Sequence, residues 1–371
     1  MIYKNFQGKQ LSALGFGSMR FPVIDGDNGN IDVEKTSEMI AYAMQNGINY
    51  YDTAWMYHNG NSEPVVGQIL SKYPRESFYL ATKFPGFDQH NLSRVAEIFE
   101  KQLEKCQVEY FDFYLFHNLC EDNVDAYLDE KYGIFNYLME QKKNGRIKHL
   151  GFSTHGSFET MKRFLDAYGN DMEFCQIQLN WLDWELQRAK EKVELLKQYN
   201  IPIWVMEPVR GGKLAALDAE KEAILHSYRD EKVPAWAFRF LQTIPEVVVT
   251  LSGMSSMEQV QENIATYQDE KPLNEEEKAA LLEIADDMAK KMALPCTACN
   301  YCTTKCPKGI EIPKIIEAYN KKYAEDAKED VEVVLTDIPE EKQPKACVGC
   351  KACEAVCPQQ IKIASLMKKL S

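Results

Sequence analysis

The chain has 371 residues and a formal net charge of −13 at pH 7. This length exceeds that of one small domain and predicts a large domain with an appendage. The acidic balance argues against a nucleic-acid partner, which would require a basic patch. The sequence contains no run of 18 apolar residues, so we expect no membrane span. The first six residues lack the layout of a secretory signal, so we expect a cytoplasmic protein in a reducing compartment.

Eight short apolar runs alternate with amphipathic stretches of helical length. The runs are rich in β-branched and aromatic residues and lack a strict period of two, which is typical of a parallel sheet buried on both faces. They cover residues 14–17, 48–51, 78–81, 111–116, 147–152, 174–179, 201–206 and 247–251, and the helical stretches include 33–45, 92–105, 135–143, 158–168 and 186–199. Eight such units over roughly 250 residues predict an α/β protein with a (β/α)8 TIM barrel. A doubly wound open sheet is the alternative, but Gly15-Phe16-Gly17 is not followed by the third glycine of its fingerprint.

Polar side chains follow several of these strands at their carboxyl ends, where (β/α)8 barrels place functional groups. Asp52 follows the second predicted strand, Tyr57 comes five residues later, and Lys83 and His117 end the third and fourth strands. A single residue of this kind is more often a structural polar group than a catalytic one. Four of them on neighbouring strand ends favour a catalytic site.

The segments around these residues resemble the aldo/keto reductase superfamily. The matching segments are Gly47–Ala54 with Tyr57, Ser62-Glu63 ahead of Val66-Gly67, Gly145–Ser153, Glu207–Gly212, and Ser252-Gly253 through Glu262-Asn263. The resemblance implies reduction of a carbonyl by hydride transfer from NAD(P)H, with Tyr57 as proton donor. It also implies that the Lys83 ammonium lowers the pKa of Tyr57, that Asp52 keeps Lys83 charged, and that His117 orients the carbonyl oxygen.

The same resemblance implies a nicotinamide nucleotide site on the later loops of the barrel. Ser153 and Gln178 would hold the nicotinamide amide, and the loops after the seventh and eighth strands would hold the phosphates and adenosine. The residues concerned are Glu207, Arg210, Gly211, Gly212 and Lys213 in the first loop, and Gly253, Ser255, Gln259, Glu262 and Asn263 in the second. The choice between NADPH and NADH stays open, because the 252–263 segment has no Lys or Arg for a 2′-phosphate and Met206 stands where many relatives have an aromatic ring.

The last quarter of the chain carries one cysteine pattern twice, C-x2-C-x2-C-x3-C-P. This spacing resembles the ligand runs of two-cluster bacterial ferredoxins, in which the fourth cysteine of each run binds the other cluster. The resemblance implies two [4Fe–4S] clusters, one on Cys296, Cys299, Cys302 and Cys357, and the other on Cys347, Cys350, Cys353 and Cys306. Zinc would leave the third cysteine of each run without a role, and disulfides would need an oxidising compartment.

We therefore predict a barrel over residues 1–272, a connecting helix over 273–292, and an α+β ferredoxin-like domain over 293–371. Between its cysteine runs this domain has a helical insert over 312–330, followed by the apolar run 331–335. The whole chain is similar to bacterial and archaeal aldo/keto reductases with a C-terminal ferredoxin-type domain.

The leading functional hypothesis is an NAD(P)H-dependent reductase of a small carbonyl compound, such as an aldehyde, ketone or quinone, coupled to one-electron transfer. A hydride carries two electrons and each cluster one, so FMN or a ferredoxin- or flavodoxin-type partner would split the pair. The alternatives are a flavin-dependent reductase fed by ferredoxin and a non-catalytic redox sensor or electron carrier. Residues 19–32 and 118–132, with Trp55 and Met56, are expected to shape the substrate pocket.

Overall fold

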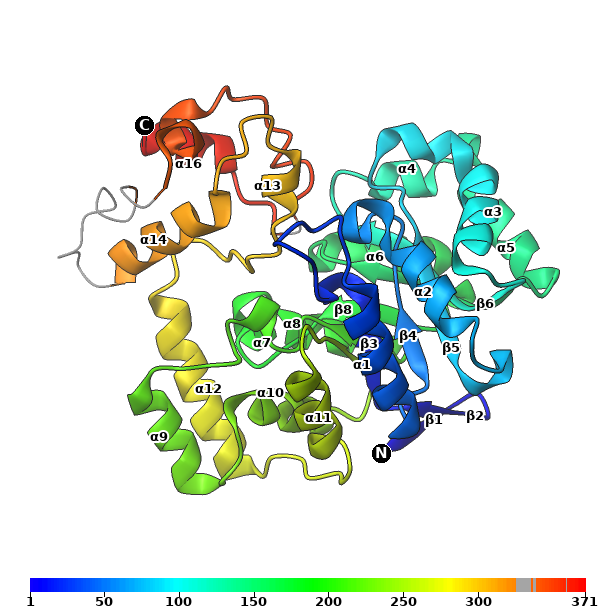
Figure 1. Cartoon of the computed structure of the whole chain (residues 1–371), viewed down its shortest axis with the longest axis horizontal. Helices are drawn as coiled ribbons and strands as arrows, with labels where there is room; N and C mark the ends of the chain where they lie inside the picture. Colours follow the sequence, from blue (N-terminus) through cyan, green and yellow to red (C-terminus); the bar gives the residue numbers. More distant parts are fainter. Residues whose placement is uncertain (325–334, 336–337, 358) are drawn as a thin grey trace. The chain divides into compact units, whose positions relative to one another are not determined.

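The computed structural model describes residues 1–324, 335, 338–357 and 359–371, and Figure 1 draws the whole chain. The chain groups into two compact units. The first unit comprises Met1–Pro208 and Pro234–Leu273, and the second comprises Val209–Val233 and Asn274–Ser371.

The first unit is built on a closed barrel of eight parallel strands, in the order β10-β3-β4-β5-β6-β7-β8-β9. All eight predicted apolar runs form strands, which confirms the predicted (β/α)8 barrel. The strands are β3 (Leu14–Gly17), β4 (Tyr50–Asp52), β5 (Tyr79–Phe84), β6 (Phe111–Leu119), β7 (Ile147–Thr154), β8 (Cys175–Gln178), β9 (Ile203–Met206) and β10 (Val247–Gly253). Nearly every strand residue is buried, as expected when interior side chains and outer helices cover both faces of the sheet.

Helices surround the strands of this unit (Figure 1). They are α1 (Val33–Gln45), α2 (Ser62–Leu70), α3 (Val95–Cys106), α4 (Val124–Leu128), α5 (Ile134–Lys143), α6 (Phe158–Tyr168), α7 (Asp183–Leu186), α8 (Ala189–Gln198), α10 (Val233–Gln242) and α11 (Met257–Thr266). Side-chain caps fix several starts: Asp32, Ser157 and Ser256 each accept a hydrogen bond from a backbone N–H in the first turn of α1, α6 and α11. Each predicted helical stretch of the barrel overlaps one of these helices.

An antiparallel hairpin of β1 (Tyr3–Phe6) and β2 (Lys9–Ser12) precedes the barrel, where the apolar pattern predicts no element. Its turn residues Gln7 and Gly8 both have positive φ, +49° and +82°, which is the geometry of a two-residue type I′ turn. Phe6 and Leu11 are buried in one cluster with interior residues near the starts of the barrel strands, among them Tyr50, Phe113 and Trp204. The hairpin therefore closes the amino-terminal end of the barrel, opposite the carboxyl strand ends.

In the second unit, α9 (Ala219–Tyr228) packs against α12 (Glu275–Lys290), which is the helix predicted over 273–292. The Arg229 guanidinium makes two hydrogen bonds of 3.0 and 2.7 Å with the Glu277 carboxylate, and Asn274 and Glu277 form a capping box at the start of α12. The arginine and the cap fix the first turn of α12.

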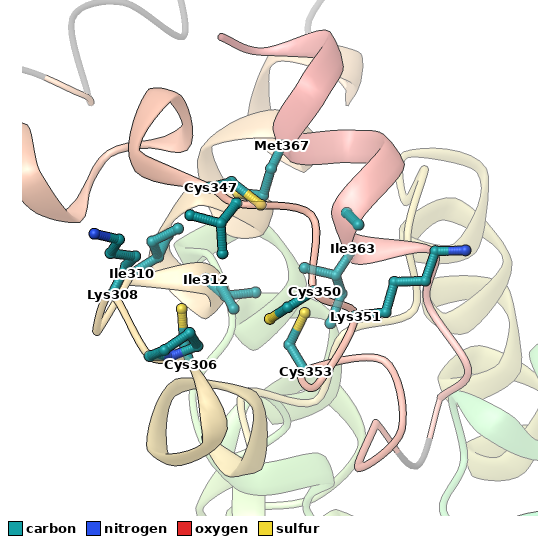
Figure 2. Close-up of a pocket in the computed structure, with 13 residues that line it drawn as sticks. Cys306, Lys308, Ile310, Ile312, Cys347, Cys350, Lys351, Cys353, Ile363 and Met367 are labelled. Atoms are coloured by element: carbon teal, nitrogen blue, oxygen red, sulfur yellow. The ribbon is translucent and has the colours of Figure 1, made fainter.

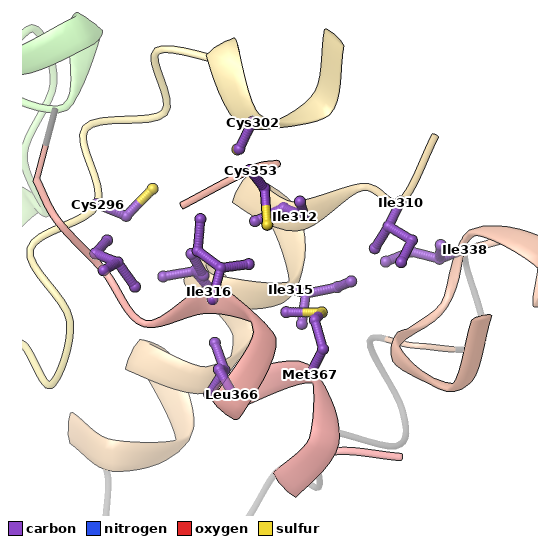
Figure 3. Packing of buried hydrophobic residues seen from close by; sticks show 12 residues of the cluster. Cys296, Cys302, Ile310, Ile312, Ile315, Ile316, Ile338, Cys353, Leu366 and Met367 are labelled. Carbon is purple, nitrogen blue, oxygen red and sulfur yellow. The ribbon is translucent and has the colours of Figure 1, made fainter. Parts of the chain in front are cut away.

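The tail contains α13 (Tyr301–Lys305), α14 (Ile312–Ala324) and α16 (Ile363–Lys369). Its core is formed by isoleucines of α14 together with Leu366 and Met367 of α16, and buried cysteines border this cluster (Figure 3). Residues 325–330 of the predicted insert, residues 331–334 of the apolar run that follows, and Pro358 lie outside the described residues. Within the described parts of the chain, no helix has the length and apolar character needed to cross a membrane.

Candidate active site and cluster sites

Asp52, Tyr57, Lys83 and His117 lie together at the carboxyl ends of three neighbouring strands. Asp52 ends β4, Lys83 lies on β5 and His117 on β6, while Tyr57 begins a 3-10 turn, η2 (Tyr57–Gly60), after β4. The Lys83 Nζ lies 5.1 Å from the centroid of the Tyr57 ring, and the Tyr57 and His117 rings meet edge to face at 6.1 Å. All four side chains are buried.

The turn that carries Tyr57 is held in an unusual backbone shape. His58 and Asn59 have φ of +53° and +56°, a left-handed conformation that residues other than glycine seldom adopt. Hydroxyl contacts fix the surrounding loop: the Thr53 and Ser62 hydroxyls are 2.9 Å apart, and Ser62 donates to the Ser18 hydroxyl at 2.7 Å. Strain of this kind clusters at functional sites, where the surrounding structure pays for it.

Lys83 and Asp52 form a buried ion pair. The Lys83 ammonium donates to Asp52 Oδ1 at 2.6 Å and to the Thr53 carbonyl at 2.8 Å. Burial lowers the pKa of Lys83, and the Asp52 charge opposes this shift; burial likewise raises the pKa of Asp52, and Lys83 opposes it. A buried pair with this geometry keeps both charges only because each stabilises the other.

A second buried carboxylate lies behind Lys83. Glu63 Oε1 accepts hydrogen bonds from Thr82 Oγ1 at 2.8 Å and from Gln102 Nε2 at 2.7 Å, and the Gln102 amide also donates to the Lys83 carbonyl. The Glu63 charge raises the pKa of Lys83, against the effect of burial. Glu63 belongs to the family-like segment, but its sequence position does not reveal that its charge acts on Lys83.

The pKa of Tyr57 differs from the sequence-based expectation. Burial raises it well above 10, and the charges of Asp52 and Glu207 raise it further. The pKa of Tyr57 is therefore raised and not lowered as expected, because burial removes the phenol from water. The phenol is held protonated, which is the state that a proton donor requires.

His117 is held neutral by its surroundings. Burial, then the positive charges of Lys83 and His155, lower the pKa of His117 well below 6.5. Its Nδ1 has no hydrogen-bond partner among the described residues, and the Phe87 ring packs edge-on against the imidazole at 5.3 Å. A neutral imidazole with an unused buried nitrogen suits a hydrogen bond to a ligand oxygen. Phe87 lies in the loop after β5, and its contact with His117 is visible only in the fold.

The residues predicted to hold the nicotinamide amide lie on the adjacent strands β7 and β8. Ser153 Oγ accepts a hydrogen bond from the Asn118 backbone N–H at 2.9 Å. Gln178 donates from Nε2 to Asp183 Oδ2 at 2.7 Å, and its Oε1 lies 3.2 Å from His155 Nδ1. Asp183 also accepts from Asn180 Nδ2 at 2.8 Å, so one buried carboxylate orients both amides.

The loop after β10 carries the second predicted group of nucleotide residues. Gly253 lies against Arg20, where a Cβ atom would come within 2.7 Å of the arginine side chain. The Ser255 hydroxyl donates to the Arg20 carbonyl at 2.7 Å, the Ser255 N–H donates to Gln259 Oε1, and Asn263 donates to the Ser252 hydroxyl. Gln259, Glu262 and Asn263 all lie on α11. These bonds fix the loop and the start of the helix.

The residues Arg210–Lys213 fall in the second compact unit, and Glu207 falls in the first. Arg210 begins a 3-10 turn, η7 (Arg210–Gly212), and is fully buried. Its guanidinium donates to the Pro295 carbonyl at 3.1 Å and to the Cys296 carbonyl at 3.4 Å. Burial lowers the pKa of Lys213, and a negative charge on Cys296 would raise it. Both cations are thus close to the first residue of the first cysteine run.

Four cysteines from both runs line one pocket in the tail. They are Cys306 of the first run and Cys347, Cys350 and Cys353 of the second (Figure 2). Ile310, Ile312, Ile363 and Met367 form its apolar wall. These four cysteines are the set predicted for one [4Fe–4S] cluster, in which Cys306 of the first run joins three cysteines of the second run.

The other cysteines also meet across the two runs. Burial raises the pKa of Cys302 to about 12, with further contributions from nearby Cys296 and Cys357, and Cys296 also raises the pKa of Cys357. Cys357 of the second run therefore lies near Cys296 and Cys302 of the first. Thiols with pKa values in this range bind as thiolates only when a metal takes the place of the proton.

The two cysteine loops repeat one backbone geometry. Ala298 and Gly349 occupy equivalent positions two residues after the first cysteine, with φ of +54° and +69°, and each donates its N–H to the Sγ of that cysteine at 3.4 Å. Asn300 and Lys351 are also equivalent, with φ of +66° and +60°. Within the described residues, no three His, Cys, Asp or Glu side chains are placed to hold a single metal ion. The paired thiols and their N–H···S bonds suit an iron–sulfur cluster better than a single zinc ion.

A parallel eight-stranded barrel with a buried tyrosine, lysine, aspartate and histidine at its strand ends, followed by eight paired cysteines, defines an oxidoreductase with an iron–sulfur tail. Residues 13–286 match the aldo/keto reductase family, and residues 295–361 match the 4Fe-4S dicluster domain. The chain belongs to the aldo/keto reductase family and carries a C-terminal dicluster domain.

Similar proteins and structures support this assignment. The chain is 28% identical over 214 residues to probable aldo-keto reductase 1 of Glycine max, which covers 56% of this chain and 58% of that protein. It is 25% identical over 300 residues to the NADH-specific methylglyoxal reductase of Escherichia coli (strain K12), covering 69% of this chain and 89% of that protein. The solved structure of aldo-keto reductase AKR11C1 from Bacillus halodurans has a TM-score of 0.61 and 25% identity, and the match covers 75% of this chain and 93% of that chain.

Proposed function

We propose that the barrel reduces a small carbonyl compound with NAD(P)H and that the tail binds two [4Fe–4S] clusters for one-electron transfer. The observation that carries this proposal is the buried group around Tyr57. Its phenol is held protonated, an ammonium lies 5.1 Å from its ring, and a neutral histidine lies beside it.

The residues at the strand ends fit a nicotinamide nucleotide. His117 Nδ1 and Asp52 Oδ2 are buried polar atoms without hydrogen-bond partners among the described residues, which leaves His117 able to bind a ligand atom. Ser153 and Gln178 would hold the amide group, and the loop after β10 would take the phosphates and adenosine. When bound, the reduced nicotinamide supplies a hydride to the carbonyl carbon.

Tyr57 would transfer its hydroxyl proton to the carbonyl oxygen as negative charge develops there. Carbonyl, NAD(P)H and one proton become alcohol and NAD(P)⁺, and solvent returns the proton to Tyr57. Lys83 would stabilise the phenolate that remains, Asp52 would keep Lys83 charged, and neutral His117 would donate a hydrogen bond that orients the oxygen. Proton donation of this kind contributes about 10²–10⁴-fold to a rate.

The eight cysteines of the tail would hold the two clusters, whose chemistry is the gain or loss of one electron each. A ferredoxin- or flavodoxin-type protein would be the partner for single electrons.

The test is oxidation of NADPH and NADH by anaerobically purified protein with a panel of aldehydes, ketones and quinones. Methylglyoxal belongs in this panel because of the name of the E. coli relative. Tyr57→Phe should lower kcat by about 10²–10⁴-fold, because the proton donor is removed. Tyr51→Phe is the matched control: Tyr51 is buried on the same strand as Asp52, and its hydroxyl donates to the Ile48 carbonyl and to no other described residue.

Equal loss of activity in the two variants would contradict a specific role for Tyr57. Full activity of Tyr57→Phe would refute the proton-donor assignment. Bound flavin in the isolated protein, or tight NAD(P)H binding without turnover across the panel, would favour the flavin-dependent and sensor alternatives respectively.

A further inference from the structure

One segment of the second cysteine run is exposed. Cys350 is the only exposed cysteine of the eight cluster cysteines, all of which the structure describes; the others are buried or half-buried. Val348, in the same loop, is 59% exposed, although an aliphatic side chain of this size is usually hidden. The loop thus presents a cluster ligand and an apolar side chain to solvent.

Two lysines flank this loop. Lys308 and Lys351 are exposed and lie at opposite edges of the ring formed by Cys306, Cys347, Cys350 and Cys353 (Figure 2). The described ion pairs of the tail use other lysines, namely Lys314, Lys321, Lys342 and Lys345. The nearest acidic residue of the loop, Glu354, is half-buried and accepts a hydrogen bond from the Ala364 N–H at 2.8 Å.

We propose that Val348, Cys350, Lys351 and Lys308, here called the Cys350 face, form the docking site for an acidic one-electron carrier protein. The chain has a net charge of −13, so an acidic protein would be repelled by most of its surface. The two lysines, free of carboxylate partners in the described tail, offer local attraction and orient the encounter. Val348 supplies an apolar centre, and Cys350 is the cluster ligand that a docked protein could approach most closely.

A face of four side chains predicts a weak, transient complex, as is common for electron-transfer partners. The two lysines at its edges predict strong dependence on ionic strength, because exposed charges are screened within about 10 Å at 0.1 M salt. The inference rests on the tail holding its clusters, as proposed above, and does not depend on carbonyl reduction by the barrel.

The experiment measures binding of oxidised flavodoxin, an acidic carrier, to the anaerobic full-length protein with both clusters loaded. We expect binding at low ionic strength that weakens at least tenfold at high ionic strength. Lys308→Glu/Lys351→Glu should weaken it at least tenfold, and Lys308→Gln/Lys351→Gln should have an intermediate effect. Lys143→Glu/Lys190→Glu is the control, since it changes the net charge equally at exposed lysines of the first unit and should change the affinity less than twofold.

Basic cytochrome c serves as the probe of opposite charge and should not compete with flavodoxin. Iron content and cluster absorbance establish that each variant is loaded, and the Gln pair keeps the test valid if the Glu pair loses iron. Absence of flavodoxin binding, equal weakening by the control pair, or no effect of the Lys308 and Lys351 variants would overturn the proposal. Failure of carbonyl reduction with intact flavodoxin binding would count against the barrel's proposed function alone.

Discussion

Lys83 and Asp52 place two opposite charges in the interior of the barrel. Both are almost completely excluded from solvent, and the 2.6 Å contact between them offsets the cost of burying each charge. The left-handed backbone at His58 and Asn59 adds further strain nearby. A protein selected for stability alone would place apolar side chains here, so the pair supports the acid–base step proposed at Tyr57.

Replacing one partner should therefore be more damaging than replacing both. Lys83→Met should lower the free energy of unfolding of the barrel by about 3–5 kcal/mol at pH 7, because it leaves the Asp52 carboxylate buried without a counter-charge. Lys83→Met/Asp52→Asn should recover most of this loss while remaining inactive. Urea denaturation of the three proteins, followed by tryptophan fluorescence, measures the difference; equal stabilities would contradict the account of the pair.

The Lys83→Met variant should also respond to pH. Burial raises the pKa of Asp52 above its ordinary value of 3.8. An acid whose pKa is higher in the folded state binds protons more tightly when folded, so stability rises as the pH falls through that folded pKa. The deficit relative to the unmodified protein should be smaller at pH 5 than at pH 8, and a deficit that grows on acidification would contradict this sign.

His155 predicts a pH dependence of opposite sign. Burial and the nearby Lys192 charge lower its pKa to about 4, although the hydrogen bond with Gln178 opposes the shift. Between pH 6.5, the ordinary pKa of histidine, and pH 4, His155 takes up a proton in the unfolded chain but not in the folded chain. The free energy of unfolding therefore decreases as the pH falls through this range. His155→Gln should reduce the difference in unfolding free energy between pH 7 and pH 5 by about 2 kcal/mol, measured by the same denaturation.

The two cysteine loops are the elements in which backbone conformation matters most. Each loop turns back on its first cysteine through a left-handed residue, and each donates an N–H to a thiol sulfur. The left-handed residue is Gly349 in the second loop and Ala298 in the first. The Cβ atom of Ala298 makes this backbone conformation less favourable than it is for glycine. The two loops therefore allow glycine and alanine to be compared at equivalent positions with the same backbone conformation.

Substitutions at these two positions should have opposite effects. Gly349→Ala should destabilise the second loop by about 1 kcal/mol, because alanine disfavours a positive φ. A Cβ atom at this position would have no neighbour within 4 Å, so no steric clash adds to this cost. Ala298→Gly removes the corresponding strain, and the greater freedom of glycine in the unfolded chain offsets part of the gain. Anaerobic cluster release at raised temperature should be faster for Gly349→Ala and unchanged or slower for Ala298→Gly; accelerated release in both would show that the shared geometry is not what limits stability.

At the scale of the whole molecule, the barrel could be predicted from the sequence because every strand is a distinct apolar run bounded by polar residues. The catalytic candidates were accessible for the same reason, since Asp52, Lys83 and His117 end strands that the pattern locates well. The hairpin at residues 3–12 was missed because two four-residue strands carry little periodicity. The raised pKa of Tyr57 and the hydrogen bonds of Glu63 depend on which side chains the fold buries together. The spacing of residues in the sequence does not predict these contacts.

Arg210 has two candidate roles that the sequence does not distinguish: binding a phosphate of the nucleotide and stabilising the backbone of the tail. Family resemblance suggests a phosphate ligand, whereas the structure gives its guanidinium to the carbonyls of Pro295 and Cys296. Arg210→Gln should destabilise the tail by about 1–3 kcal/mol, because it removes charged hydrogen bonds to the Pro295 and Cys296 carbonyls. Faster loss of cluster absorbance on treatment with a chelator would support this role; a raised KM for NAD(P)H with normal cluster retention would support the phosphate role instead.

The hydrogen bond between Arg210 and the Cys296 carbonyl also links residues 209–213 to the proposed cluster site. Residues 209–213 contain none of the cysteines proposed to bind iron, yet Arg210 donates a hydrogen bond to the backbone carbonyl of one of them. In protein prepared without iron, Cys296 would lack the metal proposed to hold its side chain, and limited proteolysis should cut residues 209–213 faster than in the loaded protein.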